Sequence, residues 1–354
     1  MAQEQSIFPL LQDVGALQNI VSGLQDQLYN PFWRQYLTMA APQISLNFSQ
    51  VLDGNALATA ASIVSRDSET PLRARDVVKL LSGELPPIRV MRKLSETQYR
   101  EFLSLQSITN IDSATRNNQQ IQLIWDDVKY VAEAVDLRLD YLLLQMLSTG
   151  KIDINVSNNP DGIIISDVDL GLDSGNKIVV SGSKWETVGS ADPIKDFQDV
   201  VSAARAKGYS LGKALMNPST YSKFINTTKV KDYFKNVIIT QQGVNEVLVG
   251  AGLPPIEIVD RPIPVEEDGE RKITTPFADN KVAFIPNGQL GVIKNAVATE
   301  ALRPVKQVDY ANVNRTLISK WSQNEPFGEW TKSELNAFPV LSSINNIFIL
   351  TTTK

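Results

Sequence analysis

The sequence contains neither cysteine nor histidine, and these two absences exclude several classes of protein. Without cysteine there is no disulfide framework and no thiolate nucleophile, and without both residues there is no Cys/His zinc site. Without histidine there is no Ser-His-Asp triad and no imidazole general base. Enzymes that depend on these groups are therefore excluded.

A strong charge of one sign is also absent. The 34 Lys and Arg residues against 39 Asp and Glu residues give a net charge of −5. Proteins that wrap nucleic acid need a surplus of Lys and Arg, so this chain is not a dedicated nucleic-acid wrapper. The N-terminal segment lacks the pattern of a signal peptide, and the apolar run near residues 141–144 is too short to cross a bilayer. We expect assembly in a cytosol and no membrane partner.

The N-terminal region contains an apolar stripe. Val14, Leu17, Val21, Leu24 and Leu28 recur at helical spacing and predict an amphipathic helix over residues 10–29, which Pro31 ends. Two interpretations remain open. The helix either docks on the core of its own chain or forms a terminal arm that packs on a neighbouring subunit.

Residues 119–148 carry the strongest helical period in the sequence. The apolar residues recur every three or four positions: Ile121, Ile124, Val128, Val131, Val135, Leu139, Leu142 and Met146. We expect one long helix that lies across a sheet and ends at Gly150. Its outer surface is expected to be acidic, with Asp126, Asp127, Glu133, Asp136 and Asp140.

Residues 48–92 differ from the rest of the chain because charged residues alternate in sign between breaks at Pro71, Gly83 and Pro86. We interpret this segment as two strand arms with a charged tip, a long projecting hairpin. Eight Lys and Arg against five Asp and Glu over residues 66–100 leave a local charge of 8 − 5 = +3 in an acidic chain. The difference favours contact with a second copy, although most charged runs are only solvated loops. The candidate contact residues are Arg66, Asp67, Glu69, Arg73, Arg75, Lys79, Arg89 and Arg92.

The remaining elements predict an α+β chain rather than a regular alternation of strands and helices. Residues 151–190 resemble strands, and Asp192-Pro193 and Asn217-Pro218 each combine a helix cap with a proline at the first helical position. A hairpin is expected at residues 266–271, and the last fifty residues are expected to be rich in β-strand.

Several short motifs imitate catalytic or binding sites and fail in detail. The segment from Gly208 to Ala214 has three residues between its glycines and no hydroxyl after Lys213, so it does not form a phosphate loop. Asp167, Asp169 and Asp173 lack the ligand spacing of a calcium loop. The Ser181–Lys184 spacing of serine acylases occurs without its partner motifs, and the carboxylate pairs Asp126/Asp127 and Glu266/Glu267 lie outside any aromatic-rich segment. We therefore expect no catalytic residue, no cofactor and no metal.

Five short segments, in order along the chain, resemble the phage major capsid protein E family, the lambda-like coat proteins of tailed phages. The first runs from Ser65-Arg66-Asp67-Ser68 through Thr70-Pro71 and Pro86-Pro87 to Arg92-Lys93-Leu94. The others are Trp185 with Asp192-Pro193 and Asp196, residues 214–232, Ile285-Pro286-Asn287-Gly288 with Leu290-Gly291, and Phe338-Pro339-Val340-Leu341. Each segment is degenerate alone, but their order is specific.

The resemblance implies the Hong Kong 97-like capsid fold, an α+β fold. On that pattern, residues 1–47 are an N-terminal arm, 48–92 the E-loop, and 93–191 the peripheral domain with the spine helix 119–148. Residues 192–305 would be the axial domain, and 306–354 would return to the peripheral sheet. A lysine–asparagine cross-link, which some relatives of this fold form, is not expected, because nothing in the sequence marks a pair.

The implied function is structural. Copies of the chain would form hexamers and pentamers of an icosahedral head around double-stranded DNA, which an acidic inner surface would contain without sequence-specific binding. The partners would be the chain itself, a portal, and a separate scaffolding or decoration protein, and the location would be the virion after assembly in the host bacterial cytoplasm. An encapsulin-like compartment with an enzyme cargo is the alternative, and a hydrolase is a distant third.

Overall fold

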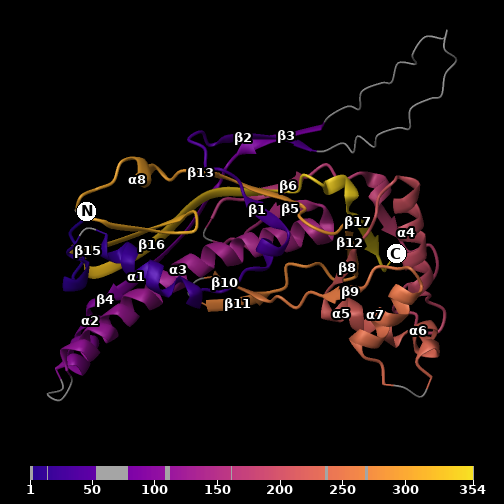
Figure 1. Ribbon diagram of the computed structural model, residues 1–354, viewed down its shortest axis with the longest axis horizontal. Coiled ribbons are helices and arrows are strands. Elements are labelled where there is room, and N and C mark those ends of the chain that lie inside the picture. Colours follow the sequence, from indigo (N-terminus) through magenta and orange to yellow (C-terminus); the bar gives the residue numbers. More distant parts are fainter. Residues whose placement is uncertain are drawn as a thin grey trace, which may run out of the picture.

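The structure is a computed structural model that describes residues 3–13, 15–52, 79–107, 112–160, 162–235, 238–267 and 270–353. Two β-sheets occupy opposite ends of an elongated molecule, and one long helix, α3 (Ser113–Thr149), runs between them (Figure 1). The N-terminal segment lies beside the first sheet, and the last strand lies in the second (Figure 1). The mixed α+β architecture expected from the sequence is confirmed.

Helix α3 begins and ends at residues suited to those positions. The side chain of Asp112 accepts a hydrogen bond from the Thr115 amide at 2.6 Å, and Gly150 ends the helix with a φ of 72°. All the predicted stripe residues from Ile124 to Met146 are buried. The helix begins six residues before the predicted start. Residues 113–118 carry no apolar period, so the stripe gave no signal for this part of the helix, and the Asp112 cap determines where it begins. It spans about 55 Å at about 1.5 Å per residue.

The first sheet has six strands in the order β1-β13-β16-β15-β14, and β4 pairs with β16. Its strands are β1 (Leu37–Met39), β4 (Pro87–Ser95), β13 (Gly291–Ala296), β14 (Asp309–Val313), β15 (Thr316–Asn324) and β16 (Phe327–Val340). Helix α3 packs on one face of β4, β15 and β16. Alternating apolar positions of these strands therefore face the helix stripe.

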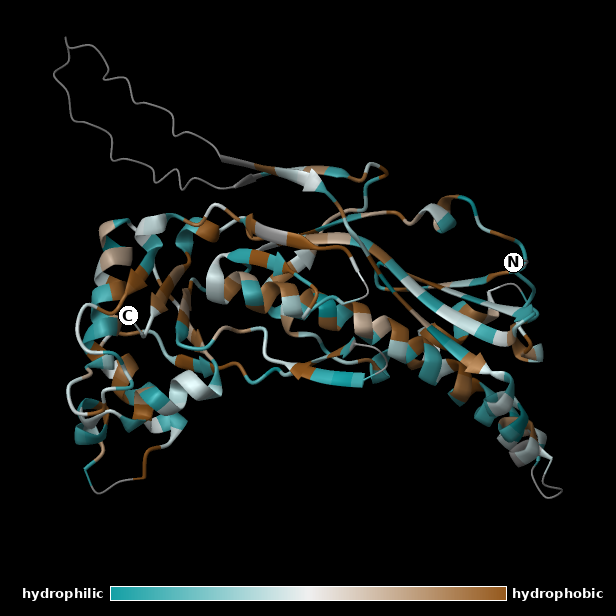
Figure 2. Ribbon diagram, turned by 180° about the vertical axis from the view of Figure 1, so that it is seen from behind, coloured by the Kyte–Doolittle hydropathy of each residue, from teal (hydrophilic) through white to brown (hydrophobic). Residues whose placement is uncertain are grey.

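The second sheet has the order β7-β17-β12-β8-β9. Its strands are β7 (Lys177–Val179), β8 (Lys213–Met216), β9 (Ile256–Ile258), β12 (Lys281–Ile285) and β17 (Phe348–Thr351). The surrounding helices are α4 (Pro193–Ala206), α5 (Pro218–Asn226), α6 (Thr228–Tyr233) and α7 (Gln241–Gly250), and they gather at this end of the molecule (Figures 1 and 2). The caps predicted for α4 and α5 are confirmed, because Asp192 and Asn217 accept hydrogen bonds from the amides of Lys195 and Thr220.

Sheet pairing crosses the boundary proposed from the sequence between residues 305 and 306. Strand β13 precedes residue 305 but pairs with β16 in the first sheet. Strand β17 follows residue 306 but pairs with β12 and β7 in the second sheet. The chain passes between the two sheets more often than a division into consecutive blocks allows.

The N-terminal region forms a shorter helix than predicted. Helix α1 is Ala16–Leu24, between the single 3₁₀ turns η1 (Pro9–Leu11) and η2 (Gln25–Gln27). Gly15, at a φ of 85°, separates α1 from η1. Leu17 and Val21 are buried with Val128 and Val131 of α3, so the helix docks on the core of its own chain.

Three strand pairs lie outside the two sheets. β2 (Asn47–Leu52) and β3 (Lys79–Glu84) form an antiparallel hairpin that rises away from the body (Figures 1 and 2). β5 (Lys151–Ile154) pairs with β6 (Ile165–Asp169). β10 (Ile263–Glu267) pairs with β11 (Glu270–Thr274), which confirms the hairpin predicted at residues 266–271.

Candidate assembly surfaces

The predicted contact residues of the projecting segment divide into three groups. Arg66, Asp67, Glu69, Arg73 and Arg75 lie outside the described residues. Lys79 is the first residue of β3, opposite Leu52. Arg89 and Arg92 lie in β4, which pairs with β16 along its whole length.

The placement of Arg89 and Arg92 corrects the extent of the projecting hairpin. Arg89 forms an ion pair of 2.8 Å with Glu334, and Arg92 lies 3.5 Å from Asp127 of α3. Residues 87–92 therefore belong to the first sheet rather than to a projection. The double proline Pro86-Pro87 marks the turn at which the chain leaves the hairpin and enters β4.

The base of the hairpin is also anchored to its own chain. Phe48 of β2 is buried and its ring stacks on Phe338 at 5.5 Å between centroids. The Leu85 amide donates to the Leu46 carbonyl at 2.8 Å, and Leu85 is buried in the same core. Among the described residues of the segment, only the strands beyond this base project from the body. The interpretation of residues 48–92 as one projecting hairpin is thus wrong for residues 87–92, and at the other end Phe48 packs on the body.

The acidic outer surface predicted for α3 is wrong in part: Asp126 is exposed and Glu133 and Asp136 are half-buried, but Asp127 and Asp140 are buried. Asp140 is buried and accepts hydrogen bonds from the amides of Phe32 and Trp33 at 3.0 and 2.7 Å and from the Tyr29 hydroxyl at 3.0 Å. Asp136 accepts from the Trp33 indole at 3.1 Å. Burial raises the pKa of Asp136 to about 6, although that hydrogen bond opposes the shift. These hydrogen bonds hold residues 29–33 against the helix.

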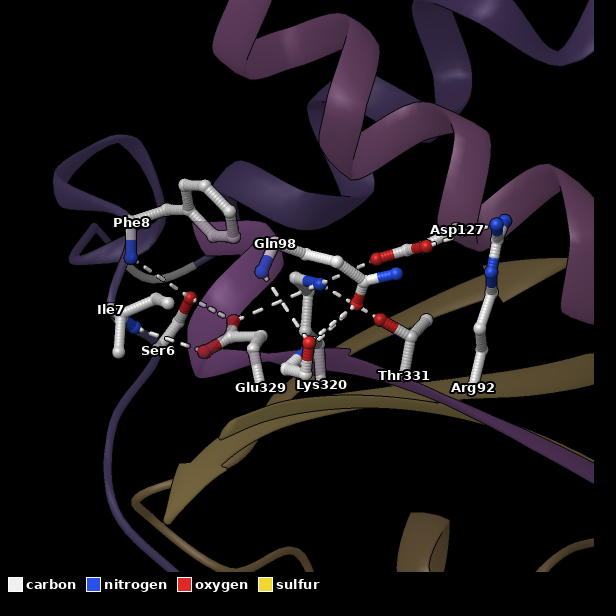
Figure 3. Close-up of polar contacts among 10 residues, drawn as sticks. Ser6, Ile7, Phe8, Arg92, Gln98, Asp127, Lys320, Glu329 and Thr331 are labelled. Carbon is white, nitrogen blue, oxygen red and sulfur yellow. Dashed lines mark hydrogen bonds and ion pairs between the residues drawn. The ribbon is translucent and has the colours of Figure 1, made fainter. Parts of the chain in front are cut away.

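Asp127 belongs to a buried charge cluster, which we define as Lys320, Asp127, Glu329 and Thr331 (Figure 3). Lys320 Nζ lies 3.7 Å from Asp127 Oδ2, 3.7 Å from Glu329 Oε1 and 2.8 Å from the Thr331 hydroxyl. The Lys320 side chain is completely buried, so its charge is balanced by these carboxylates rather than by water. Burial raises the pKa of Asp127, while Lys320 and Arg92 oppose the shift.

Strand register brings this cluster together. Asp309, Lys320, Thr331 and Arg92 are directly opposite one another on β14, β15, β16 and β4, so their side chains share the face under α3. Burial and the nearby Glu329 raise the pKa of Asp309 to about 6, and Lys320 opposes the shift. Spacing along the chain contained no signal for this row, because the four residues come from separate strands.

The N-terminal segment covers the charge cluster from outside (Figure 3). The Ser6 hydroxyl and the Ile7 amide donate to the Glu329 carboxylate, the latter at 3.1 Å. The ring of Phe8 lies 5.4 Å from Lys320 Nζ and packs edge-on against Tyr99 and Phe102 of helix α2 (Glu96–Gln106). Residues at the start of the chain therefore complete a site built mainly from the C-terminal strands.

The opposite face of the first sheet carries a second polar group. Lys332 pairs with Glu300 and with Glu334, the latter at 3.3 Å, and Ser319 donates to Glu300 at 2.9 Å. Beside it, Trp321 and Trp330 stack across the strands with their planes 9° apart. Both rings are half-buried, and Lys93 lies over Trp330. This face thus combines a stacked pair of indole rings with a network of ion pairs.

The motifs that imitate catalytic sites have structural roles. Lys213 begins β8 and pairs with Glu257 at 2.8 Å, so it does not lie in a phosphate loop. Asp173 caps the turn η4 (Ser174–Asn176) and pairs with Lys207. A cavity of about 300 Å³ lies at the start of α5, where Asn217 both caps the helix and donates to Asp279.

Two further observations concern ligands and membranes. Within the described ranges, no group of three or more acidic side chains is placed to hold a metal ion. No helix in that part of the chain combines the length and the apolar character that a bilayer crossing needs. The contacts described above are of kinds that hold one chain, or several copies of it, together.

Comparison with known proteins gives one family and one fold. The family model for phage major capsid protein E matches residues 17–352. No curated protein sequence matches the chain. Among solved structures, the putative capsid protein of a prophage of E. coli CFT073 is similar with a TM-score of 0.61 and 16% identity, over 95% of this chain and 96% of that one. A phage-related protein from Bordetella bronchiseptica RB50 is similar with a TM-score of 0.51 and 11% identity, over 99% of this chain and 98% of that one.

Proposed function

The chain belongs to the phage major capsid protein E family, and from this premise we propose how its parts build a shell. Membership makes it a structural protein of the virion, a component of the icosahedral head of a tailed phage with the Hong Kong 97-like fold. The family is not enzymatic. The family match also favours a phage head over the encapsulin-like compartment considered from the sequence.

We propose that the first sheet with α3 is the peripheral domain and that the second sheet with α4 to α7 is the axial domain. One buried core lies between the second sheet and helices α4 to α7, and another lies between the first sheet, α1 and α3, which supports this division. A third core, shared by α3 and both sheets, joins the two domains. The axial domain then consists of residues 177–285 together with β17, and the peripheral domain includes β13. Copies would close into hexamers and pentamers through repeated head-to-tail contacts.

The proposed mode of assembly depends on the projecting β2–β3 hairpin. It leaves the body at a base anchored by Phe48 and Leu85, and within the described part of the chain β2 and β3 pair only with each other. We propose that it is the start of the E-loop and that this loop lies on a neighbouring copy. Arg66, Asp67, Glu69, Arg73, Arg75 and Lys79 are the proposed contact residues. Each contact is weak, but its repetition around the shell makes the assembly stable.

The proposed partners are other copies of the chain, a portal, and a separate scaffolding or decoration protein. Double-stranded DNA would be enclosed without sequence-specific contacts, in keeping with the net charge of −5.

Electron microscopy and sedimentation of the purified protein test this function. Closed shells or rings of defined size are expected, and shells recovered from infected cells should contain DNA. A chain that stays monomeric at every concentration would contradict the proposal. Shells that contain an enzyme instead of DNA would favour the compartment.

A further inference from the structure

One edge of the first sheet, formed by β14 and by the end of β15, is covered by residues from the N-terminal region. Strand β15 pairs with β16 along Leu317–Asn324, but β14 covers its other side only as far as Lys320. Beyond Lys320, Glu4 takes the place of β14. The Glu4 amide donates to the Ser322 carbonyl at 2.9 Å, and the Ser322 amide donates to the Glu4 carbonyl at 3.0 Å.

Side chains strengthen this pairing. Asn324 Nδ2 donates to the Glu4 carboxylate at 2.7 Å, and the Ser322 hydroxyl donates to the Gln5 carbonyl at 2.5 Å. Next to this pair, Ser6 and Ile7 donate to Glu329, and Phe8 lies over Lys320. We call residues 4–8 the strap.

Helix α1 covers part of the neighbouring edge strand, β14. The side chain of Gln18 accepts a hydrogen bond from the Asn312 amide at 2.7 Å and donates to the Asn312 carbonyl at 3.4 Å. It thus satisfies both backbone groups of an edge residue of β14. The N-terminal region therefore covers the edge at two places, once through backbone and once through a side chain.

An uncovered strand edge pairs readily with other chains, because its amides and carbonyls have no partners. We infer that the strap is an autoinhibitory contact: while it is docked, it prevents a second copy of the chain from pairing with β15 beyond Lys320. This inference rests on the proposed function, in which copies of the chain associate. When the strap leaves, Ser322 loses both backbone partners and Glu329 loses two donors.

The strap is built to open as a unit without unfolding the body. Residues 4, 5 and 7 are exposed or half-buried, and only Ser6 and Phe8 are buried. Opening returns the charges of Glu329 and Lys320 to water, and their hydration offsets part of the free energy needed to expose the Phe8 ring.

The absence of cysteine allows a test by a single engineered disulfide. Glu4 and Ser322 form a hydrogen-bonded antiparallel pair, whose Cα atoms lie about 5.5 Å apart, within the range a disulfide spans. The E4C/S322C variant, oxidised when dilute, should carry an intrachain bond that locks the strap. The single variants E4C and S322C are the controls.

Sedimentation velocity over a range of concentrations then compares three proteins. A variant without residues 1–8 should associate at lower concentration than the wild type, and a synthetic peptide of residues 1–8 should reverse this. The locked variant should associate at higher concentration than the wild type, and reduction should abolish the difference. Equal association by all three proteins would overturn the inference, whether or not any of them forms shells.

Amide hydrogen exchange reports on the edge itself and does not require the deletion to fold. In the wild type, the Ser322 amide should exchange through a local opening that is faster than global unfolding. The locked variant should slow this exchange. If the Ser322 amide exchanges only when the whole protein unfolds, the strap does not open by itself. This result would also overturn the inference.

Discussion

The ammonium group of Lys320 lies 3.7 Å from the carboxylate of Asp127, although one residue is on β15 and the other on α3. The contact joins the long helix to the sheet beneath it, beside the apolar core that contains Val128 and Ile318. A second carboxylate, that of Glu329, lies at the same distance from the lysine. The residues at the start of the chain then bind Glu329, so this cluster connects three distant parts of the sequence.

Replacement of Lys320 by Met should destabilise the protein strongly. The change leaves the buried carboxylates of Asp127 and Glu329 without their shared cation, at a cost of about 3–5 kcal/mol. Urea unfolding measures the loss. The matched control is Lys306→Met, because Lys306 is exposed. The triple variant K320M/D127N/E329Q should recover part of the stability, and a K320M protein as stable as wild type would contradict the cluster's role.

Replacement of Val131 by Asp should also destabilise the fold. Val131 lies on α3 and is completely buried against α1 and the first sheet, in a cluster of apolar side chains. We expect a loss of roughly 3–5 kcal/mol in the free energy of unfolding. Asn118→Asp on an exposed turn of the same helix is the control and should change stability by less than about 0.5 kcal/mol. Unchanged melting of V131D would refute the packing of the helix stripe.

The stability of the protein should rise as the pH falls from 7 towards 5. Burial raises the pKa of Asp136 and of Asp309 to about 6, above the ordinary value of 3.8. The folded state therefore binds protons at a higher pH than the unfolded state, and this contribution to stability increases as the pH falls through 6. Urea midpoints at several pH values measure the slope. The variants D136N and D309N should each flatten it, whereas D126N, at an exposed position, should not.

Reversal of charge at Arg73 and Arg75 should impair assembly without unfolding the subunit. The double variant R73E/R75E removes two positive charges from a segment whose net charge opposes that of the rest of the chain. We expect soluble, folded protein that forms few shells, and wild-type assembly that weakens in high salt. Sedimentation beside the wild type measures both effects, and R271E/K272E on the β10–β11 hairpin is the control. Normal shells from R73E/R75E would count against the proposed contact.

Several elements of this protein were determined by local sequence. Asp112 and Gly150 set the ends of α3, Asp192-Pro193 and Asn217-Pro218 start α4 and α5, and the apolar stripe from Ile124 to Met146 specifies the buried face of the helix. These features depend on side chains within a few residues of each other, so the sequence alone contains their physical cause. The degenerate segments spread along the chain were likewise sufficient to indicate the capsid family.

Only the tertiary structure decided which polar residues are buried and what they bind. Asp127 and Asp140 resemble surface residues of a helix in the sequence, but β15 and residues 29–33 bring cations and donors to them. Arg89 and Arg92 seemed to belong to the projecting hairpin, yet pairing of β4 with β16 places them in the sheet. Strand register and long-range pairing determine such contacts, because a residue's partner across a sheet is set by the fold of the whole chain rather than by its neighbours in sequence.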